Sequence, residues 1–204
     1  MNKPNAKATP VAKSATDADA LLDINAIGIS FGGLKAVQDF SLRLPAAGLF
    51  GLIGPNGAGK TTIFNLLTGV YEPDSGEIHL ASQRIRNRKP HEITAAGIAR
   101  TFQNIRLFPD LSVLDNVRLA GQLRNRHGML STLFRTRGHQ REEQLLETRA
   151  LNLLEIFELQ DRARELASNL SYGHQRKLEI VRALATNPKV LLLDEPAAGL
   201  NPQE

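Results

Sequence analysis

Two series of alternating apolar residues stand near the start of the chain. Their members are Ile27, Ile29, Phe31, Phe40, Leu42 and Leu44. A period of two residues is typical of strands that bury one face, and the Gly32-Gly33 pair between the two series is typical of a turn. We therefore predict two short strands, joined by a turn, between residues 21 and 44.

The next segment follows the order strand, loop and helix. The apolar run at residues 49–53 predicts a strand buried on both faces, and a glycine-rich stretch follows it directly. Beyond that stretch, Ile63 and Leu66–Leu67 share one face of a predicted helix that stops at Gly69. A phosphate-binding loop requires this order of elements.

The periodicity changes to helical beyond Gly97. Ser112 with Asp115 predicts the start of a helix over 113–123, and a second, longer helix carries apolar residues at helical spacing. Those apolar residues are Leu146, Ala150, Leu153, Leu154 and Phe157. An apolar strand returns at 190–193. We predict a helical subdomain over about 98–180, inserted into a strand-rich core that spans 21–204.

Composition excludes several classes of protein. The 204 residues include no cysteine, so disulfide frameworks and cysteine-ligated metals are excluded. No apolar run approaches membrane-spanning length. The net charge of +4 comes largely from arginines between residues 118 and 141, which we interpret as a solvated helical face and not as a nucleic-acid site. Residues 1–20 lack periodicity and the apolar segment of a secretory signal, and we predict a disordered tail.

A complete phosphate-loop pattern occupies residues 54–62. Its members are Gly54, Pro55, Asn56, Gly57, Ala58, Gly59, Lys60, Thr61 and Thr62. The glycines allow backbone amides to point at a β-phosphate, the lysine bridges β- and γ-phosphates, and the Thr61 hydroxyl can ligate Mg²⁺. The pattern predicts a loop that binds a nucleotide together with Mg²⁺.

Two further segments carry groups suited to a nucleotide. Asp194 ends the apolar strand, where its carboxylate would reach the Mg²⁺ shell through water, and Glu195 can polarise an attacking water. Earlier, Ser171 and Gly173 open a helix whose amides suit an anion. One nucleotide needs only one phosphate-facing surface per chain. The pattern therefore predicts two chains that sandwich ATP between unlike faces.

Taken together, these motifs resemble the nucleotide-binding subunit of an ABC transporter, over nearly everything from Leu22 onward. FGGLKAVQDFSL, ARTFQNIRLFPDLSVLDNV, LSYGHQRKLEI and LLLDEPAAGLNP resemble the LivG branch, which energises branched-chain amino-acid importers. The resemblance implies an α/β fold, that of a P-loop NTPase of the ABC ATPase type, with an antiparallel β subdomain and a helical signature subdomain. It also implies an ATPase at the cytoplasmic face of the plasma (inner) membrane, bound peripherally.

The resemblance also implies residue roles and partners. Gln103 would join Lys60 and Glu195 as a catalytic residue and would join Thr61 and Asp194 in the Mg²⁺ network. Ser171, Tyr172 and Gly173 would contact the γ-phosphate held by the other subunit, and residues 199–201 would cross the dimer seam. Phe31 would stack on adenine, although its pattern fits a core strand residue equally well. The implied partners are a second ABC ATPase subunit in a homo- or heterodimer, two integral membrane permeases and, indirectly, a periplasmic or extracellular solute-binding protein.

The sequence departs from the family pattern in two ways. His174 stands where glutamine is common in the signature, a position that a polar residue of a first helical turn also fills. Family members continue past the equivalent of residue 204 and include a switch histidine there. The resemblance therefore implies a C-terminally truncated chain that binds nucleotide poorly and hydrolyses it slowly or not at all.

Other functions remain open to different degrees. Importers of urea, short amides or other amino acids use similar ATPases, so cargo follows only from kinship. A non-transport ABC ATPase acting on DNA would need a long coiled-coil insertion, for which the interval 103–170 is too short, and we expect no nucleic acid partner. A GTP-binding switch would need an Asn-Lys-x-Asp motif, which the sequence lacks.

Overall fold

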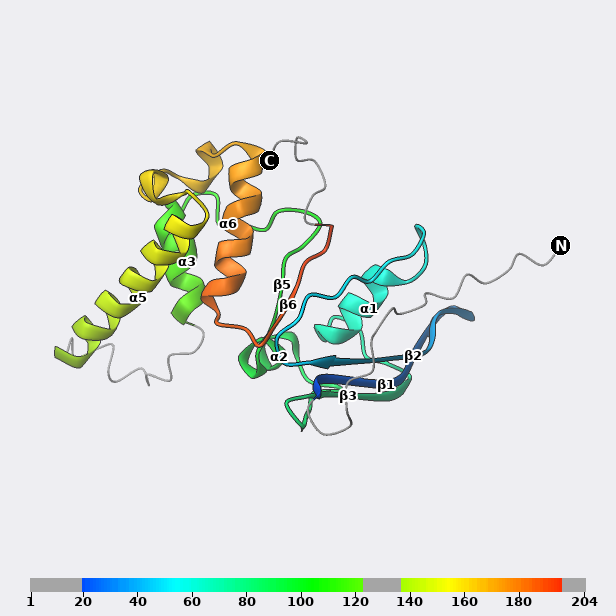
Figure 1. The fold of residues 1–204 in the computed structure, drawn as a ribbon. Helices are drawn as coiled ribbons and strands as arrows, with labels where there is room; N and C mark the ends of the chain where they lie inside the picture. Colours follow the sequence, from blue (N-terminus) through cyan, green and yellow to red (C-terminus); the bar gives the residue numbers. More distant parts are fainter. Residues whose placement is uncertain (1–19, 123–136, 196–204) are drawn as a thin grey trace. The chain divides into compact units, whose positions relative to one another are not determined.

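The computed structural model describes residues 20–122 and 137–195, and within the helix that begins at residue 137 it describes side chains from residue 143 onward. The chain divides into two compact units, Met1–Ile98 and Ala99–Glu204 (Figure 1). Residues 1–19 of the tail predicted over 1–20, much of the arginine-rich stretch and the seam loop at 199–201 lie outside the described residues. Residue 20 is an exception to the predicted tail, because it lies in the first strand.

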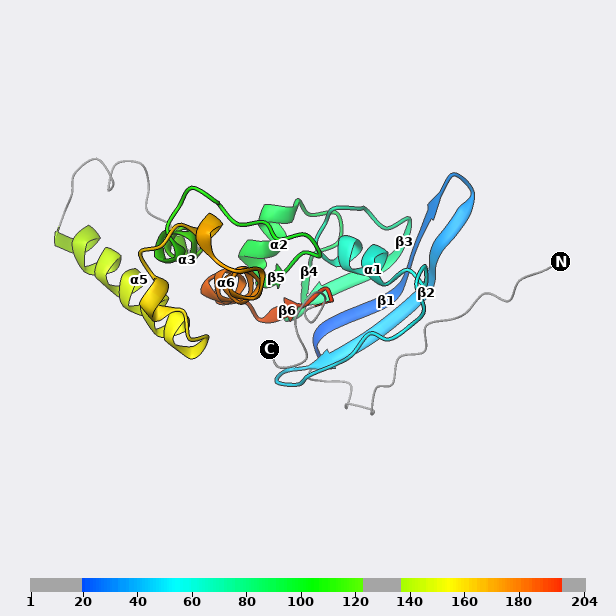
Figure 2. The same ribbon diagram turned by 90° about the horizontal axis from the view of Figure 1, so that it is seen from above.

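The first unit is built on an antiparallel sheet of four strands. They are β1 (Ala20–Phe31), β2 (Leu34–Pro45), β3 (Ser75–Leu80) and β4 (Gln83–Arg84), in the order β2-β1-β3-β4. Figure 2 shows β1 and β2 as a long hairpin. The predicted strand pair and its glycine turn are thereby confirmed, with Gly32 and Gly33 both at positive φ.

An irregularity in β1 changes which residues face the core. Leu22 and Ile24 are buried, and Ile27 and Ile29 are buried after a three-residue step. The register shifts between Ile24 and Ile27, where Ala26 has a φ of 47°. An extra residue inserted into one strand reverses the inward face, so the alternation continues in the opposite phase.

The predicted strand at residues 49–53 is wrong. No strand is assigned there, and Leu49 and Ile53 are 97% and 81% exposed. A strand exists only through hydrogen bonds to a neighbour, and none of the described strands pairs with this segment. The apolar run indicates a tendency to be buried, but it does not indicate whether another strand is available to pair with it.

Two helices complete the first unit. The helix α1 (Lys60–Leu67) buries Ile63, Leu66 and Leu67, as the sequence predicts, and Gly69 follows at a φ of 71°. The helix α2 (Pro90–Ala96) begins with a proline and has Gly97 as its C-cap. Proline at a first helical position costs no hydrogen bond, because that amide has no partner within a helix.

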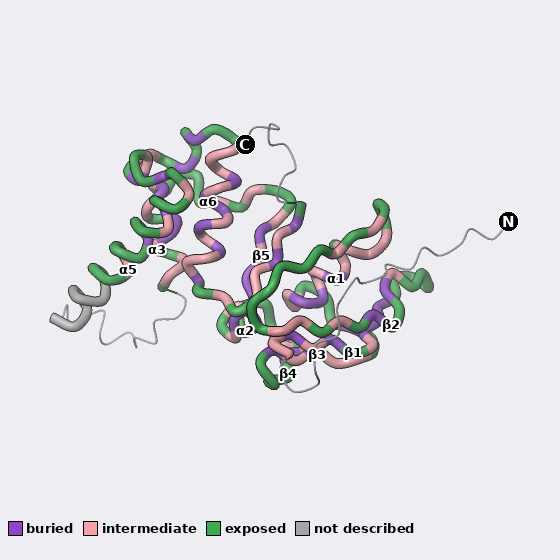
Figure 3. Tube along the Cα trace, in the orientation of Figure 1, coloured by how far each residue is buried: buried purple, intermediate pink, exposed green. Residues whose placement is uncertain are grey.

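In the described residues of the second unit, three helices pack around one apolar core. They are α3 (Val113–Gly121), α5 (Arg137–Ile156) and α6 (Tyr172–Ala185), with short 3₁₀ turns at Gln160–Arg162 and Ala167–Asn169. The core includes Val117, Leu154 and Leu178, each at most 1% exposed. A two-stranded sheet joins β5 (Ile98–Arg100) to β6 (Val190–Leu192), and Figure 3 shows the burial of β5.

Asn116 organises the loop before α3. Its side chain is fully buried, donates to the carbonyls of Phe108 (3.0 Å) and Ser112 (3.0 Å), and accepts from the Phe108 amide at 2.9 Å. A buried amide is tolerated only when its polar atoms are paired. Asn116 therefore fixes the loop that leads into the Ser112 cap.

Candidate functional site

The phosphate loop lies in the first unit and leads directly into α1. Gly57 and Gly59 adopt φ angles of 83° and 84°, and Gly59 is the N-cap of α1. A Cβ at Gly59 would lie 2.8 Å from the carbonyl oxygen of Ala36 in β2. Because this position combines a left-handed backbone with close contact to β2, only glycine fits without strain.

Lys60 folds back over the loop. Its Nζ donates to the carbonyl oxygens of Gly54 at 2.6 Å and Pro55 at 3.0 Å. An ammonium group has three donors, so these two bonds leave one for an anion. Thr61 is exposed on the first turn and Thr62 is half-buried. The loop thus presents a helix N-terminus, a cation and a hydroxyl on adjacent residues, the donor set that a phosphate requires.

Phe31 lies at the end of β1, 43% exposed, in an edge-to-face pair with Tyr71. The ring centroids are 5.1 Å apart and the interplanar angle is 67°. Such geometry is a favourable aromatic contact. The Phe31 ring is thus partly exposed and braced by a second aromatic. Tyr71 was not predicted, since a lone tyrosine before a turn gives no signal of its partner.

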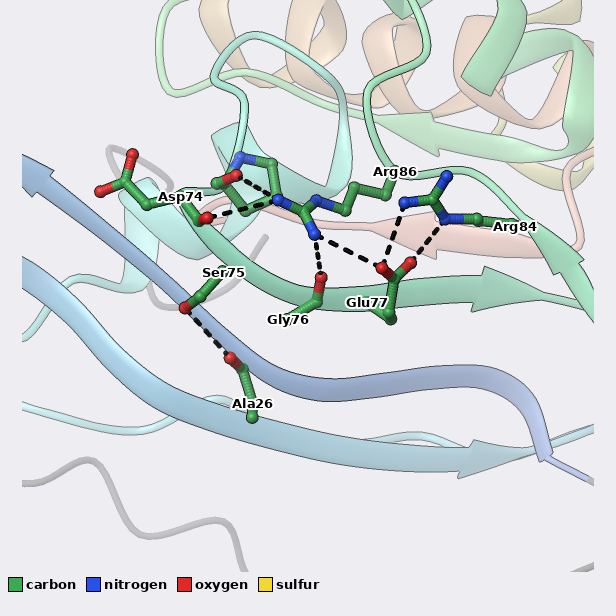
Figure 4. Close-up of polar contacts among 8 residues, drawn as sticks. Ala26, Asp74, Ser75, Gly76, Glu77, Arg84 and Arg86 are labelled. Carbon is green, nitrogen blue, oxygen red and sulfur yellow. Dashed lines mark hydrogen bonds and ion pairs between the residues drawn. The ribbon is translucent and has the colours of Figure 1, made fainter.

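The turn after Tyr71 is braced against β1 (Figure 4). Arg86 donates to the carbonyls of Pro73 at 3.1 Å and Gly76 at 2.7 Å, and the Asp74 carboxylate accepts from the Ser30 amide at 2.8 Å. Arg84 lies 2.6 Å from Glu77 and lowers the pKa of that carboxyl. These contacts hold the segment carrying Tyr71 close to the strand end carrying Phe31.

In the second unit, β6 delivers Asp194 next to β5. The Asp194 carboxylate accepts from Arg100 at 2.7 Å, and its backbone amide lies 3.4 Å from the Thr101 hydroxyl. The Thr101 amide in turn donates to Leu192 at 3.0 Å. A carboxylate has about four acceptor sites, so the Arg100 bond leaves capacity for a metal-bound water.

Gln103 and Glu195 are brought together at the surface of the second unit. The amide nitrogen of Gln103 donates to the Glu195 carboxylate at 3.2 Å, and both side chains are exposed. Glu195 has a φ of 48°, in the left-handed region that non-glycine residues seldom adopt. The sequence assigns both residues to the site but gives no sign of their mutual contact.

The signature segment opens α6 as the sequence predicts. Ser171 is the N-cap, its hydroxyl accepts from the His174 amide at 3.4 Å, and it lies 2.9 Å from Nδ1 of His174. Tyr172 is 47% exposed, and the Arg176 guanidinium lies over its ring at 5.6 Å. His174 therefore orients the signature serine as well as occupying the first turn of the helix.

The predicted site residues fall into two sets. The phosphate loop and Phe31 belong to the first unit, whereas Gln103, the signature segment, Asp194 and Glu195 belong to the second. Sequence reasoning missed Arg100, Arg176 and Glu179, which hold members of the second set in place. Charged residues in a helix or a short strand give no signal of the loop that they contact.

A model of the ABC transporter family matches residues 37–198. The chain belongs to the ABC transporter family. The high-affinity branched-chain amino acid transport ATP-binding protein LivG of Escherichia coli (strain K12) is 45% identical over 184 residues, covering 90% of this chain and 72% of the relative. The corresponding protein BraF of Pseudomonas aeruginosa is 42% identical with the same coverage.

Solved structures of ABC cassettes share this fold. One, an ATP-binding cassette of an ABC transporter in its ADP conformation, has a TM-score of 0.71 and 33% identity over 90% of this chain and 72% of its own. Another, a dimeric cassette bound to ADP and Pi, has a TM-score of 0.68 and 25% identity over 89% and 77%. The fold is therefore that of an ABC ATPase, and the ligand of this ATPase subunit is a nucleotide.

Within residues 20–122 and 137–195, no helix has both the length and the apolar character needed to cross a bilayer. The same residues contain no cluster of three or more histidine or acidic side chains placed to hold a metal by themselves. Thr61 in the first unit and Asp194 in the second each carry an oxygen of the kind that Mg²⁺ prefers.

Proposed function

We propose that the chain is the ATP-binding and hydrolysing subunit of an importer for branched-chain amino acids. The observation that carries this proposal is the 45% identity to LivG, sustained over 90% of the chain. A nucleotide-binding subunit does not contact the cargo, so kinship is the only support that the sequence offers for leucine, isoleucine and valine.

The chemistry of the proposal is phosphoryl transfer to water. When bound, MgATP supplies the transferred group and the metal charge. Lys60 neutralises negative charge on the phosphates, Thr61 and Asp194 provide oxygen donors to the metal, and Gln103 and Glu195 orient water, with Glu195 accepting its proton. The contact between Gln103 and Glu195 supports this division of labour, because it sets the two polar groups beside each other before substrate arrives.

A second subunit completes the proposed site. Ser171, Tyr172 and Gly173 would face the γ-phosphate held by the partner, with the α6 amides as donors. The dimeric state of a related cassette supports this arrangement. Two permeases in the inner membrane would dock at the cytoplasmic face, and a solute-binding protein would deliver cargo from outside.

Nucleotide binding is tested with Lys60→Ala. Affinity for ATP, measured calorimetrically, should fall about tenfold or more, since a charge-assisted contact to phosphate is lost. Lys35→Ala on β2, at an exposed position, is the matched control and should bind as the wild type does. Equal affinity in all three proteins would remove Lys60 from the site.

Hydrolysis and cargo are tested separately. In the full-length protein, Glu195→Gln should lower turnover by about 10²–10⁴-fold while ATP-dependent dimers persist in light scattering, because a general base is lost but phosphate contacts remain. In a deletion strain, uptake of labelled leucine, isoleucine and valine should fall and return with the intact gene. Undiminished uptake of all three, in a strain with no second importer for them, would refute the cargo assignment and leave the ATPase assignment standing.

A further inference from the structure

The loop that carries Gln103 has no regular secondary structure, yet its backbone is held at four points. The Arg176 guanidinium donates to the carbonyl oxygens of Phe102, at 2.6 Å, and Gln103. The Glu179 carboxylate accepts from the amides of Phe102 and Arg106, at 3.3 Å each. Buried backbone groups in a loop need partners, and two side chains of α6 provide them.

Those two side chains are themselves an ion pair. Arg176 and Glu179 lie 3.1 Å apart, one turn apart on α6, with side chains only 5% and 4% exposed. A buried pair of charges is a weak source of stability, because desolvation offsets much of its attraction. A role in holding the loop accounts for charges at these positions better than a contribution to overall stability does.

The same helix begins at the signature serine. Ser171 caps α6, and Arg176 follows less than two turns later. Gln103, whose backbone carbonyl Arg176 binds, extends its side chain to Glu195. The ion pair therefore joins the helix that begins at the signature to the loop that holds the proposed switch glutamine.

We propose that Arg176 and Glu179 are positioning residues that fix Gln103 relative to the first turns of α6, so that the signature and the glutamine move as one piece. The inference rests on the proposed function for the roles of Gln103 and Ser171. The four hydrogen bonds that Arg176 and Glu179 make with the loop backbone, which we call the clamp, do not depend on those roles and can be measured separately.

The decisive variant replaces both charges at once, as Arg176→Met with Glu179→Leu. Removing only one would leave a buried charge unpaired and could unfold the chain, whereas apolar replacement of both is often neutral or stabilising. Lys177→Met is the matched control, since Lys177 sits at the adjacent position of α6 and pairs with the exposed Glu158 at 3.3 Å.

The first measurement is amide hydrogen exchange in the full chain. In the double variant, the Phe102 and Arg106 amides should exchange roughly ten- to a hundredfold faster, because bonds to a charged acceptor are lost. The Thr101 amide, which donates to Leu192, should stay within about twofold of the wild type. Unchanged exchange at Phe102 and Arg106 in a folded double variant would overturn the clamp.

The second measurement is steady-state ATP hydrolysis by the full-length protein. The double variant should lose about tenfold in kcat with KM for MgATP within about twofold, since a misplaced Gln103 affects turnover and the phosphate loop is untouched. Lys177→Met should match the wild type in both constants. A kcat of the double variant equal to that of the wild type would refute the positioning role. A wild type that neither binds nor hydrolyses ATP would instead refute the proposed function. Hydrogen exchange would then still test whether Arg176 and Glu179 hold the loop backbone.

Discussion

The guanidinium of Arg100 lies 2.7 Å from the carboxylate of Asp194, and the two side chains are only 4% and 11% exposed. The pair joins the last residue of β5 to the residue that the sequence assigns to the metal shell. Asp194 is thus oriented by a strand neighbour that lies 94 positions earlier in the chain.

This pair should matter to stability. Arg100→Met leaves the Asp194 carboxylate buried without its partner, and we expect the free energy of unfolding to fall by about 3–5 kcal/mol in urea titration. Arg162→Gln breaks a half-exposed pair with Glu165 and should cost about 1 kcal/mol or less. Equal losses of unfolding free energy in the two variants would show that burial does not make the Arg100–Asp194 pair more important for stability than an exposed pair.

The close approach of the phosphate loop to β2 gives a second prediction. Gly33 and Gly59 have nearly the same φ, 85° and 84°, but a Cβ added at Gly59 would meet Ala36 and Val37 within 4 Å, whereas one added at Gly33 would meet nothing. Gly33→Ala should cost about 1–2 kcal/mol for the left-handed backbone. Gly59→Ala should cost a further 1–3 kcal/mol or so for the overlap. Thermal unfolding of both variants separates the cost of the left-handed backbone from the cost of the overlap. Equal unfolding midpoints in the two variants would contradict the packing argument.

Asn116 provides a third prediction, about the loop before α3. Asn116→Ala removes the partners of the Phe108 backbone and should lower stability by about 1–3 kcal/mol in urea titration. Asn152→Ala, on the exposed face of α5, should change it by no more than about 0.5 kcal/mol. A small loss at position 116 would mean that water replaces the side chain there.

Comparison of the two serine caps distinguishes an effect on stability from an effect on ATP turnover. Ser112 caps α3 and Ser171 caps α6, each accepting from an amide three residues on. Ser112→Ala and Ser171→Ala should each cost about 1 kcal/mol of stability. Only Ser171→Ala should lower ATP turnover, measured at matched folded fractions, because only this cap belongs to the signature. Equal turnover in the two variants would remove Ser171 from the proposed γ-phosphate contact.

Sequence patterns predicted the elements that depend on local chemistry. The Ser112 and Ser171 caps, the apolar face of α1 and the turn at Gly32 each follow from a few adjacent residues, and each is confirmed. The strand at 49–53 was wrong because pairing depends on a distant segment. The bulge at Ala26 was missed because an alternating pattern does not reveal where its phase will reverse.

The candidate site was predicted as a set of residue types but not as an arrangement. Gln103 and Glu195 were both identified, yet their contact joins residues 92 positions apart. Arg176 and Glu179 were assigned no role from the sequence. They are buried because a loop more than 70 positions earlier covers them.

Recognition of the Gln103 loop through its main chain has an evolutionary consequence. All four bonds from Arg176 and Glu179 end on backbone atoms of Phe102, Gln103 and Arg106, and none ends on the side chains at 104 and 105. Substitution at those two positions leaves the anchoring bonds intact. The surface of this loop can thus change by mutation at 104 and 105 while its backbone keeps the same four anchors.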